Sequence, residues 1–151
     1  MTHYVSTQPY HTEPMNALVV YCSDGRVCEQ CDEFITRGLN LPRYDRVTVP
    51  GGPASLVGHD KAKLPHTGVL DDLKLLVDGH GIDRIVLIQH EDCAFYKVRL
   101  GVDEQSLEQT QKADLGRAAR MIEQAMDVKQ IDGYFARRTE TGVTFEPVEL
   151  M

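Results

Sequence analysis

The sequence predicts an α/β fold with a central, mostly parallel β-sheet flanked by helices and closed by a C-terminal strand pair. Short apolar runs alternate with segments of helical periodicity, the order expected of right-handed crossovers between parallel strands. Residues 131–150 instead hold two β-prone runs around a turn that contains Gly142, which favours an antiparallel pair. A chain of 151 residues is the size of one compact domain.

The predicted strands end in turn-forming residues. "ALVVYC" is a continuous apolar run, typical of a strand covered on both faces, and Ser-Asp-Gly follows it. "YDRVTV" is expected to be a second strand that stops at Pro50, and "DRIVLIQH" a third. The first sixteen residues lack periodicity, so we expect a tail over residues 1–16 and a single domain over residues 17–151.

Three helices are predicted between and after these strands. Residues 29–38 resemble a short helix that Gly38 closes in a left-handed cap. Residues 67–81 form the second, and after a polar linker residues 107–126 form a long third helix. The apolar positions expected to face the core are Val69, Leu73, Leu76 and Val77 in the second helix, and Leu115, Ala118, Ala119, Ile122 and Met126 in the third.

Composition excludes some classes of partner. The formal net charge of −7 and the scattered lysines and arginines argue against nucleic-acid binding, and "RRTET" at 137–141 is interpreted as a solvated turn. The chain shows neither a signal-peptide pattern nor an apolar run near the ~20 residues that span a bilayer, so we expect a cytoplasmic protein without a membrane partner.

Parallel sheets place ligands beyond the carboxyl ends of their strands, where "CSDGR", "PGG" and "QHEDC" are expected to meet. Cys22, His90 and Cys93 would then converge. Two thiolates and an imidazole are a favoured zinc set, and three protein ligands leave a fourth tetrahedral position open. The His-x-x-Cys spacing alone is a weak signal, because a buried cysteine and a strand-end histidine without metal give the same pattern.

The two motifs together resemble the β-class carbonic anhydrases. "CSDGR" matches that family's Cys-x-Asp-x-Arg signature, "HEDC" matches its His-x-x-Cys signature, and "DGYFARRTETGVTF" is similar to its closing strand pair. The resemblance implies a β-carbonic-anhydrase-like fold, Zn²⁺ held by Cys22, His90 and Cys93, and a homodimer or higher homo-oligomer. It also implies that Asp24 and Arg26 form the family's catalytic dyad.

The dyad has a physical interpretation. Asp24 would accept a hydrogen bond from the attacking oxygen and orient it towards the substrate carbon, while Arg26 keeps the carboxylate ionised and in place. The resemblance also implies that Asp24 can turn onto the metal when the pair with Arg26 breaks. Small residues at Gly51 and Gly52 would let backbone approach a substrate pocket, although a plain turn explains them equally well.

The predicted function is therefore zinc-dependent, reversible hydration of carbon dioxide, a small neutral substrate, to bicarbonate. Ala94, Phe95 and Tyr96 depart from the glycine that usually follows the second cysteine in the family, which motivates a first alternative: hydrolysis of a carbon dioxide analogue such as carbonyl sulfide or carbon disulfide. A second alternative is a non-catalytic zinc protein in which Asp24 or Cys28 fills the fourth position.

The sequence leaves the roles of two other cysteines and two other histidines undecided. Cys28 and Cys31 are a candidate redox pair at a helix start, with idle thiols or metal ligation as alternatives. His59 and His66 are candidate proton shuttles, although exposed loop histidines are the ordinary interpretation of such positions.

Overall fold

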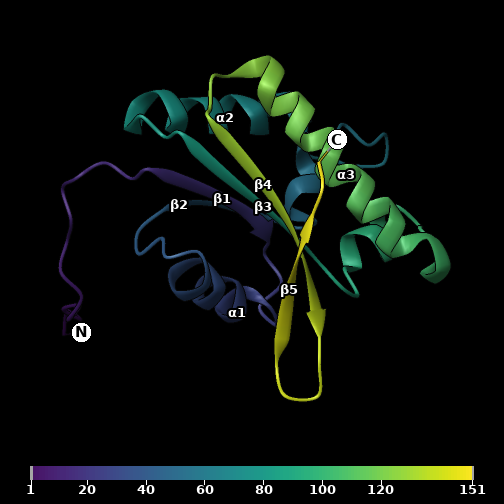
Figure 1. Ribbon diagram of the computed structural model, residues 1–151, viewed down its shortest axis with the longest axis horizontal. Coiled ribbons are helices and arrows are strands. Elements are labelled where there is room, and N and C mark those ends of the chain that lie inside the picture. The colour runs from purple at the N-terminus through teal and green to yellow at the C-terminus, as the bar shows by residue number, and fades with distance from the viewer. Residues whose placement is uncertain (1, 151) are drawn as a thin grey trace.

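The computed structural model describes residues 2–150 and arranges their strands in one sheet of order β2-β1-β3-β4-β5. β1 pairs parallel with β2 and β3, β3 pairs parallel with β4, and β5 pairs antiparallel with β4. The predicted fold class, with its C-terminal strand pair, is confirmed (Figure 1). The strands are β1 (Ala17–Cys22), β2 (Asp45–Val49), β3 (Arg84–His90), β4 (Gln130–Arg138) and β5 (Val143–Val148).

Helices cover both faces of this sheet, so the domain has three layers. In Figure 1 α2 and α3 lie above the sheet and α1 lies below it. Short helical turns, labelled η, connect these elements. The helical elements are α1 (Cys28–Glu33), η1 (Phe34–Gly38), η2 (Gly52–Leu56), α2 (His66–His80), η3 (Phe95–Arg99) and α3 (Glu104–Ala125).

The side chains of β1 alternate between two hydrophobic cores, because successive residues of a strand point to opposite faces. Leu18 and Val20 pack with α2 and α3, whereas Val19 and Tyr21 pack with α1. Burial on both faces explains why this strand is a continuous apolar run in the sequence. The apolar positions predicted to face inward in α2 and α3 are all at least partly buried.

Helix boundaries differ from the predictions where local capping decides them. α3 starts three residues early, because the side chain of Asp103 accepts a hydrogen bond from the backbone N–H of Ser106 and caps the helix there. Gly38 is not the left-handed residue after α1 and η1; Asn40 adopts that conformation, with φ of 56°. The segment predicted as a polar linker contains η3, which packs Tyr96 into the interior.

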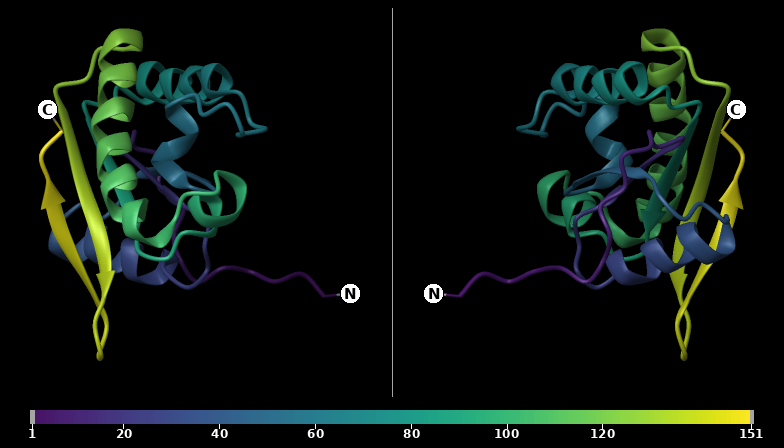
Figure 2. Two further views of the ribbon diagram at one scale, coloured as in Figure 1. Left: turned by 90° about the vertical axis from the view of Figure 1, so that its right-hand side faces the viewer. Right: turned by 90° about the vertical axis from the view of Figure 1, so that its left-hand side faces the viewer.

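The segment read as a solvated turn is partly strand. Arg137 and Arg138 lie in β4, and Arg137 pairs with Glu146 of β5 at 2.8 Å from its Nε and with Glu108 of α3. The turn itself spans residues 139–142. Figure 2 shows this β4–β5 hairpin projecting beyond the body of the domain, and it shows the N-terminal segment running outward from the body.

Within residues 2–150 the helices are too short or too polar to cross a lipid bilayer.

The turn after β2 brings backbone very close to the end of β1. Gly51 and Gly52 both have positive φ, at 82° and 50°. A Cβ atom on Gly52 would lie 2.8 Å from the backbone nitrogen of Cys22, and backbone has little freedom to move away. Glycine is therefore required here by both conformation and space.

We predict that Gly52→Ala destabilises the protein by roughly 2 kcal/mol or more, because it combines a strained φ with a backbone clash. Urea unfolding measures the change. Gly68→Ala is the matched control: Gly68 lies in α2 with open space around it, so alanine there is expected to be neutral or to stabilise by ~0.5–1 kcal/mol. Equal stability of Gly52→Ala and the wild type would contradict the argument.

Candidate metal centre

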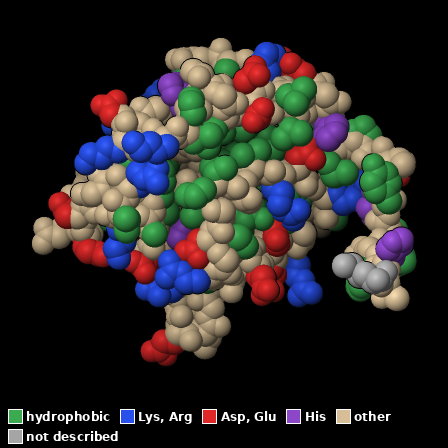
Figure 3. All heavy atoms as spheres, turned by 180° about the vertical axis from the view of Figure 1, so that it is seen from behind, with side chains coloured by type: hydrophobic (Ala, Val, Ile, Leu, Met, Phe, Trp, Pro, Cys, Tyr) green, Lys and Arg blue, Asp and Glu red, His purple; other side chains and the backbone are tan. Residues whose placement is uncertain are grey.

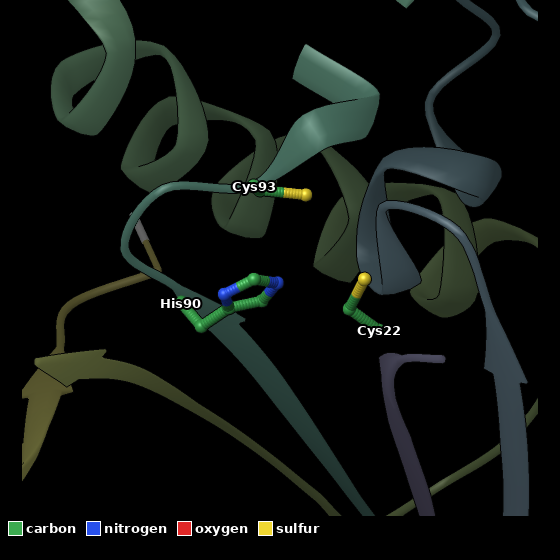
Figure 4. A group of neighbouring side chains, drawn as sticks. All are labelled: Cys22, His90 and Cys93. Atoms are coloured by element: carbon green, nitrogen blue, oxygen red, sulfur yellow. The ribbon is translucent and has the colours of Figure 1, made fainter. Parts of the chain in front are cut away.

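Three side chains converge at the carboxyl end of the sheet. Cys22 ends β1 and His90 ends β3, and these strands are hydrogen-bonded neighbours that run in the same direction. Cys93 follows on the next turn, which Asp92 folds back by adopting a φ of 57°. One ligand atom from each of Cys22, His90 and Cys93 lies within 4.8 Å of the other two, and all three residues are buried (Figure 4).

The imidazole of His90 is held in one tautomer. Its Nδ1 donates a hydrogen bond of 2.7 Å to the carbonyl oxygen of Glu91, so Nε2 carries the lone pair. That Nε2 is buried and has no hydrogen-bond partner among the described residues. In Figure 4 the ring points into the space between the two sulfur atoms. A buried acceptor without a donor is costly, and a cation at this point would satisfy it.

The two buried sulfurs lie within 4.8 Å of each other. Their proximity favours one thiolate beside one thiol, which lowers the pKa of Cys22 and raises the pKa of Cys93. Burial disfavours the protonated form of His90, but the nearby Cys22 thiolate outweighs burial and raises the pKa of the imidazole. A divalent cation would take the place of these protons and allow both sulfurs to be thiolates.

Backbone donors already face both sulfurs. The N–H of Gly51 donates to the Cys22 sulfur at 3.4 Å, and the backbone N–H groups of Phe95 and Tyr96 beside Cys93 act to lower the pKa of its thiol. Such donors favour thiolate over thiol. The centre offers two buried sulfurs and one unprotonated imidazole nitrogen at close spacing. This donor set fits a tetrahedral zinc ion, whose ligands are sulfur and nitrogen.

Asp24 and Arg26 form a bidentate pair beside this centre. Arg26 Nη2 donates to Asp24 Oδ2 at 2.7 Å, its Nε lies 3.0 Å from the same oxygen, and its backbone N–H donates to Oδ1. These bonds lower the pKa of Asp24 to about 2, so the carboxylate is ionised at neutral pH. Arg26 also donates to the carbonyl oxygen of Asp92, which ties the turn after β1 to the turn that carries Cys93.

Asp24 faces Arg26 and is outside the group of metal-ligating atoms. Cys28 is outside it too, because its thiol donates to the carbonyl oxygen of Asp24 at 3.1 Å. Over residues 2–150 the only group of three or more such side chains is Cys22, His90 and Cys93. A metal held there would have these three side chains as its ligands from the described residues.

A small cavity of about 130 Å³ opens beside Asp24 and His90. Three apolar side chains from separate parts of the chain contribute to its wall: Val27 before α1, Ala136 of β4 and Val143 of β5. Gly51 and Gly52 do not line it, and the ring of Phe95 lies over Gly51. The sequence predicted both glycines at a substrate pocket, but they are not part of this cavity. They contact the end of β1 instead.

A second, larger hollow lies on the outer side of η3. It has a volume of about 400 Å³, and its lining includes Pro50, Phe95 and the exposed side chains of Leu64 and Val98. Figure 3 shows the face of the domain opposite to the view of Figure 1, where hydrophobic side chains gather in the middle and charged groups surround them. Phe95, next to the position where the family usually has glycine, lines the hollow, and its ring also lies against Gly51.

The candidate redox pair lies at the start of α1. Burial raises the pKa of Cys28, and it raises that of Cys31 further because Cys31 is almost completely buried. The nearby carboxylate of Asp32 adds to both shifts. Neither thiol has the lowered pKa that a reactive redox cysteine uses, so their redox role stays a prediction without support from their surroundings.

Sequence reasoning missed a buried polar network behind the centre. Gln111 and Asp114 of α3 are completely buried, as are Gln89 of β3 and Tyr96 of η3. The available signal was their spacing: residues 111 and 114 share a helix face with Leu107, Leu115 and Ala118, all of which point inward. His59, predicted as a candidate proton shuttle, is hydrogen-bonded through Nε2 to Asp114 Oδ2 at 2.6 Å. It does not line the small cavity beside Asp24.

Curated relatives and solved structures are similar to this chain. It is 25% identical over 121 residues to an uncharacterized protein of Rickettsia conorii, covering 78% of this chain and 63% of that protein. It is 28% identical over 98 residues to an uncharacterized protein of Rickettsia bellii, covering 62% of this chain and 58% of that protein. The chain therefore spans about three fifths of the length of these two relatives.

Two crystal structures share the fold. β-Carbonic anhydrase isoform I from Trichomonas vaginalis aligns with a TM-score of 0.59 at 14% identity, over 95% of this chain and 88% of that one. A carbonic anhydrase from Streptococcus mutans aligns with a TM-score of 0.51 at 19% identity, over 93% of this chain and 87% of that one. The family model described as "Putative carbonic anhydrase" matches residues 12–146, and the chain belongs to that family.

Proposed function

We propose that the protein is a zinc lyase that reversibly hydrates carbon dioxide to bicarbonate. The observation that carries the proposal is the unpartnered Nε2 of His90, buried between two sulfurs, with an ionised Asp24 beside it. Cys22, His90 and Cys93 would hold the ion. Zinc bound there would supply a Lewis acid that makes water a nucleophile near neutral pH.

The protein's own groups have separate tasks in the reaction. Asp24, kept ionised by Arg26, accepts a hydrogen bond from the attacking water and thereby directs an oxygen lone pair towards the substrate carbon. The Nδ1–H of His90 is committed to the carbonyl of Glu91, so the ring keeps its orientation throughout. The net reaction consumes one water and one carbon dioxide and releases bicarbonate and one proton, which passes to buffer.

The cavity fits a small, neutral substrate. Its volume of about 130 Å³ and its apolar wall of Val27, Ala136 and Val143 accommodate a linear triatomic molecule that makes no hydrogen bonds of its own. The charged residues at the same cavity are of both signs: Arg26 and Arg138 lie there with Asp24, Glu91 and Asp92. A homo-oligomer stays a prediction that sedimentation analysis can test.

We predict that the purified protein holds one zinc ion per chain and accelerates carbon dioxide hydration, as measured by stopped flow between pH 7 and 9. Two buried cysteine ligands would favour tight binding, and a fourth position left to water would allow turnover. Zinc-loaded protein with no rate above buffer would contradict the proposal. Faster release of sulfide from carbonyl sulfide or carbon disulfide than formation of bicarbonate would instead favour hydrolysis of those analogues.

We predict that Asp24→Asn retains zinc but loses kcat/KM by ~100-fold or more, because the amide keeps the shape and removes the anionic acceptor. Metal analysis and the hydration assay, run on the same sample, separate the two effects. Asp78→Asn is the matched control, since Asp78 pairs with Lys74 on the exposed face of α2 and should leave both zinc content and rate unchanged. An Asp24→Asn variant with wild-type rate would remove Asp24 from the mechanism.

We predict that Arg26→Met lowers the rate at pH 7–8 by ~10-fold or more through loss of orientation. Removing Arg26 lets the pKa of Asp24 rise from about 2 towards the ordinary ~4, so the carboxylate of the variant stays ionised at neutral pH. Below about pH 5 it begins to gain a proton while the wild type does not, so the ratio of variant to wild-type rate should fall further there. Rates measured from pH 4 to 9 test this, and a variant rate equal to wild type throughout would contradict it.

A further inference from the structure

Two polar side chains of α3 reach the segment that carries His90 and Cys93. Gln111 and Asp114 are three residues apart on one helix face, and neither exposes any surface. Buried polar groups are costly unless they are bonded, so their partners indicate what they are for.

Gln111 holds the backbone at His90. Its Nε2 donates a hydrogen bond of 2.8 Å to the carbonyl oxygen of His90. The same nitrogen lies 3.5 Å from Oε1 of Gln89, the residue before His90 in β3. The side chain of Gln111 therefore holds the backbone at the end of β3, next to the metal centre, against α3.

Asp114 holds the helical turn that follows Cys93. Its Oδ2 accepts a hydrogen bond of 2.7 Å from the hydroxyl of Tyr96 and lies 2.6 Å from Nε2 of His59, and its Oδ1 accepts from Arg117 at 3.1 Å. Gln89 Nε2 in turn donates to the Tyr96 hydroxyl at 2.9 Å, which joins the two halves of the network. Burial and the Asp114 carboxylate raise the pKa of Tyr96, so its hydroxyl keeps the proton that it donates.

Tyr96 links the network to Cys93. It lies three residues after Cys93, its side chain packs in the same buried cluster as Cys93, and its hydroxyl is fixed by Asp114 and Gln89. A shift of the Tyr96 ring therefore displaces the helical turn that follows Cys93, whose carbonyl accepts from the N–H of Lys97. Neither Asp114 nor Gln111 belongs to the ligand group itself.

We propose that Gln111, Asp114 and Tyr96 are positioning residues that hold His90 and Cys93 at the spacing a metal ion requires. The proposal rests on the proposed zinc centre, but it concerns metal binding and not the reaction. Groups that orient metal ligands typically change metal affinity by ~10–100-fold when they are removed.

The test compares zinc affinity, by competition with a chromogenic chelator, for the wild type, Tyr96→Phe and Asp114→Asn. We expect both variants to bind zinc ~10-fold or more weakly, and their cobalt-substituted forms to show shifted thiolate-to-cobalt absorption bands. Unfolding midpoints of the metal-free proteins are measured in parallel, so that a general loss of stability is recognised.

Tyr44→Phe is the matched control. The Tyr44 hydroxyl donates to Asp32 at 2.7 Å, a bond like that of Tyr96 to Asp114 but packed near α1, outside the group of metal-ligating residues. This variant should lose stability on a similar scale and keep the zinc affinity and cobalt spectrum of the wild type.

Two results would overturn the inference: zinc affinity and cobalt spectra within twofold of wild type in both network variants, or equal changes in the Tyr44→Phe control. Failure of the wild type to bind zinc would overturn it together with the proposed function. A wild type that binds zinc without hydrating carbon dioxide would remove the proposed function alone, because affinity and spectra are independent of turnover.

Discussion

The parallel pairing of β1 with β3 is the constraint on which the rest of the centre depends. Because neighbouring parallel strands end at the same edge of a sheet, residues distant in the sequence are brought together without a loop that has to reach across. Cys22 and His90 occupy those two ends, and the left-handed Asp92 returns Cys93 to the same place. Three donors are thus fixed by elements buried on both faces, which is the rigid support that a metal centre needs.

Hydrogen bonds then decide the chemical state of each donor. The carbonyl of Glu91 sets the tautomer of His90, backbone N–H groups face both sulfurs, and Arg26 sets the charge and orientation of Asp24. Arg26 also contacts the turn of Asp92, so the dyad and the ligand-bearing turn are held as one unit. The surrounding network of α3 extends this support to the far side of the same turn.

Strand ends and motifs were predictable from the sequence because they depend on local patterns. The apolar run of β1 and the helical periodicity of α3 indicated the layers, and the alternation of strands and helices indicated parallel pairing. The exact ends of the helices were not predicted. The side chain of Asp103 caps the start of α3 by a hydrogen bond, and Asn40 takes the left-handed conformation that was expected at Gly38. The contribution of the β4–β5 hairpin to the cavity depends on tertiary packing, which puts Ala136 and Val143 beside Asp24.

X-ray absorption at the zinc edge of the loaded protein tests the central claim most directly, because it counts the atoms around the ion. We expect two sulfurs at ~2.3 Å, one imidazole nitrogen at ~2.0 Å and one exchangeable oxygen. A third sulfur, or a shell without sulfur, would contradict it, because the fourth position would then be closed or the ion would lie elsewhere in the protein.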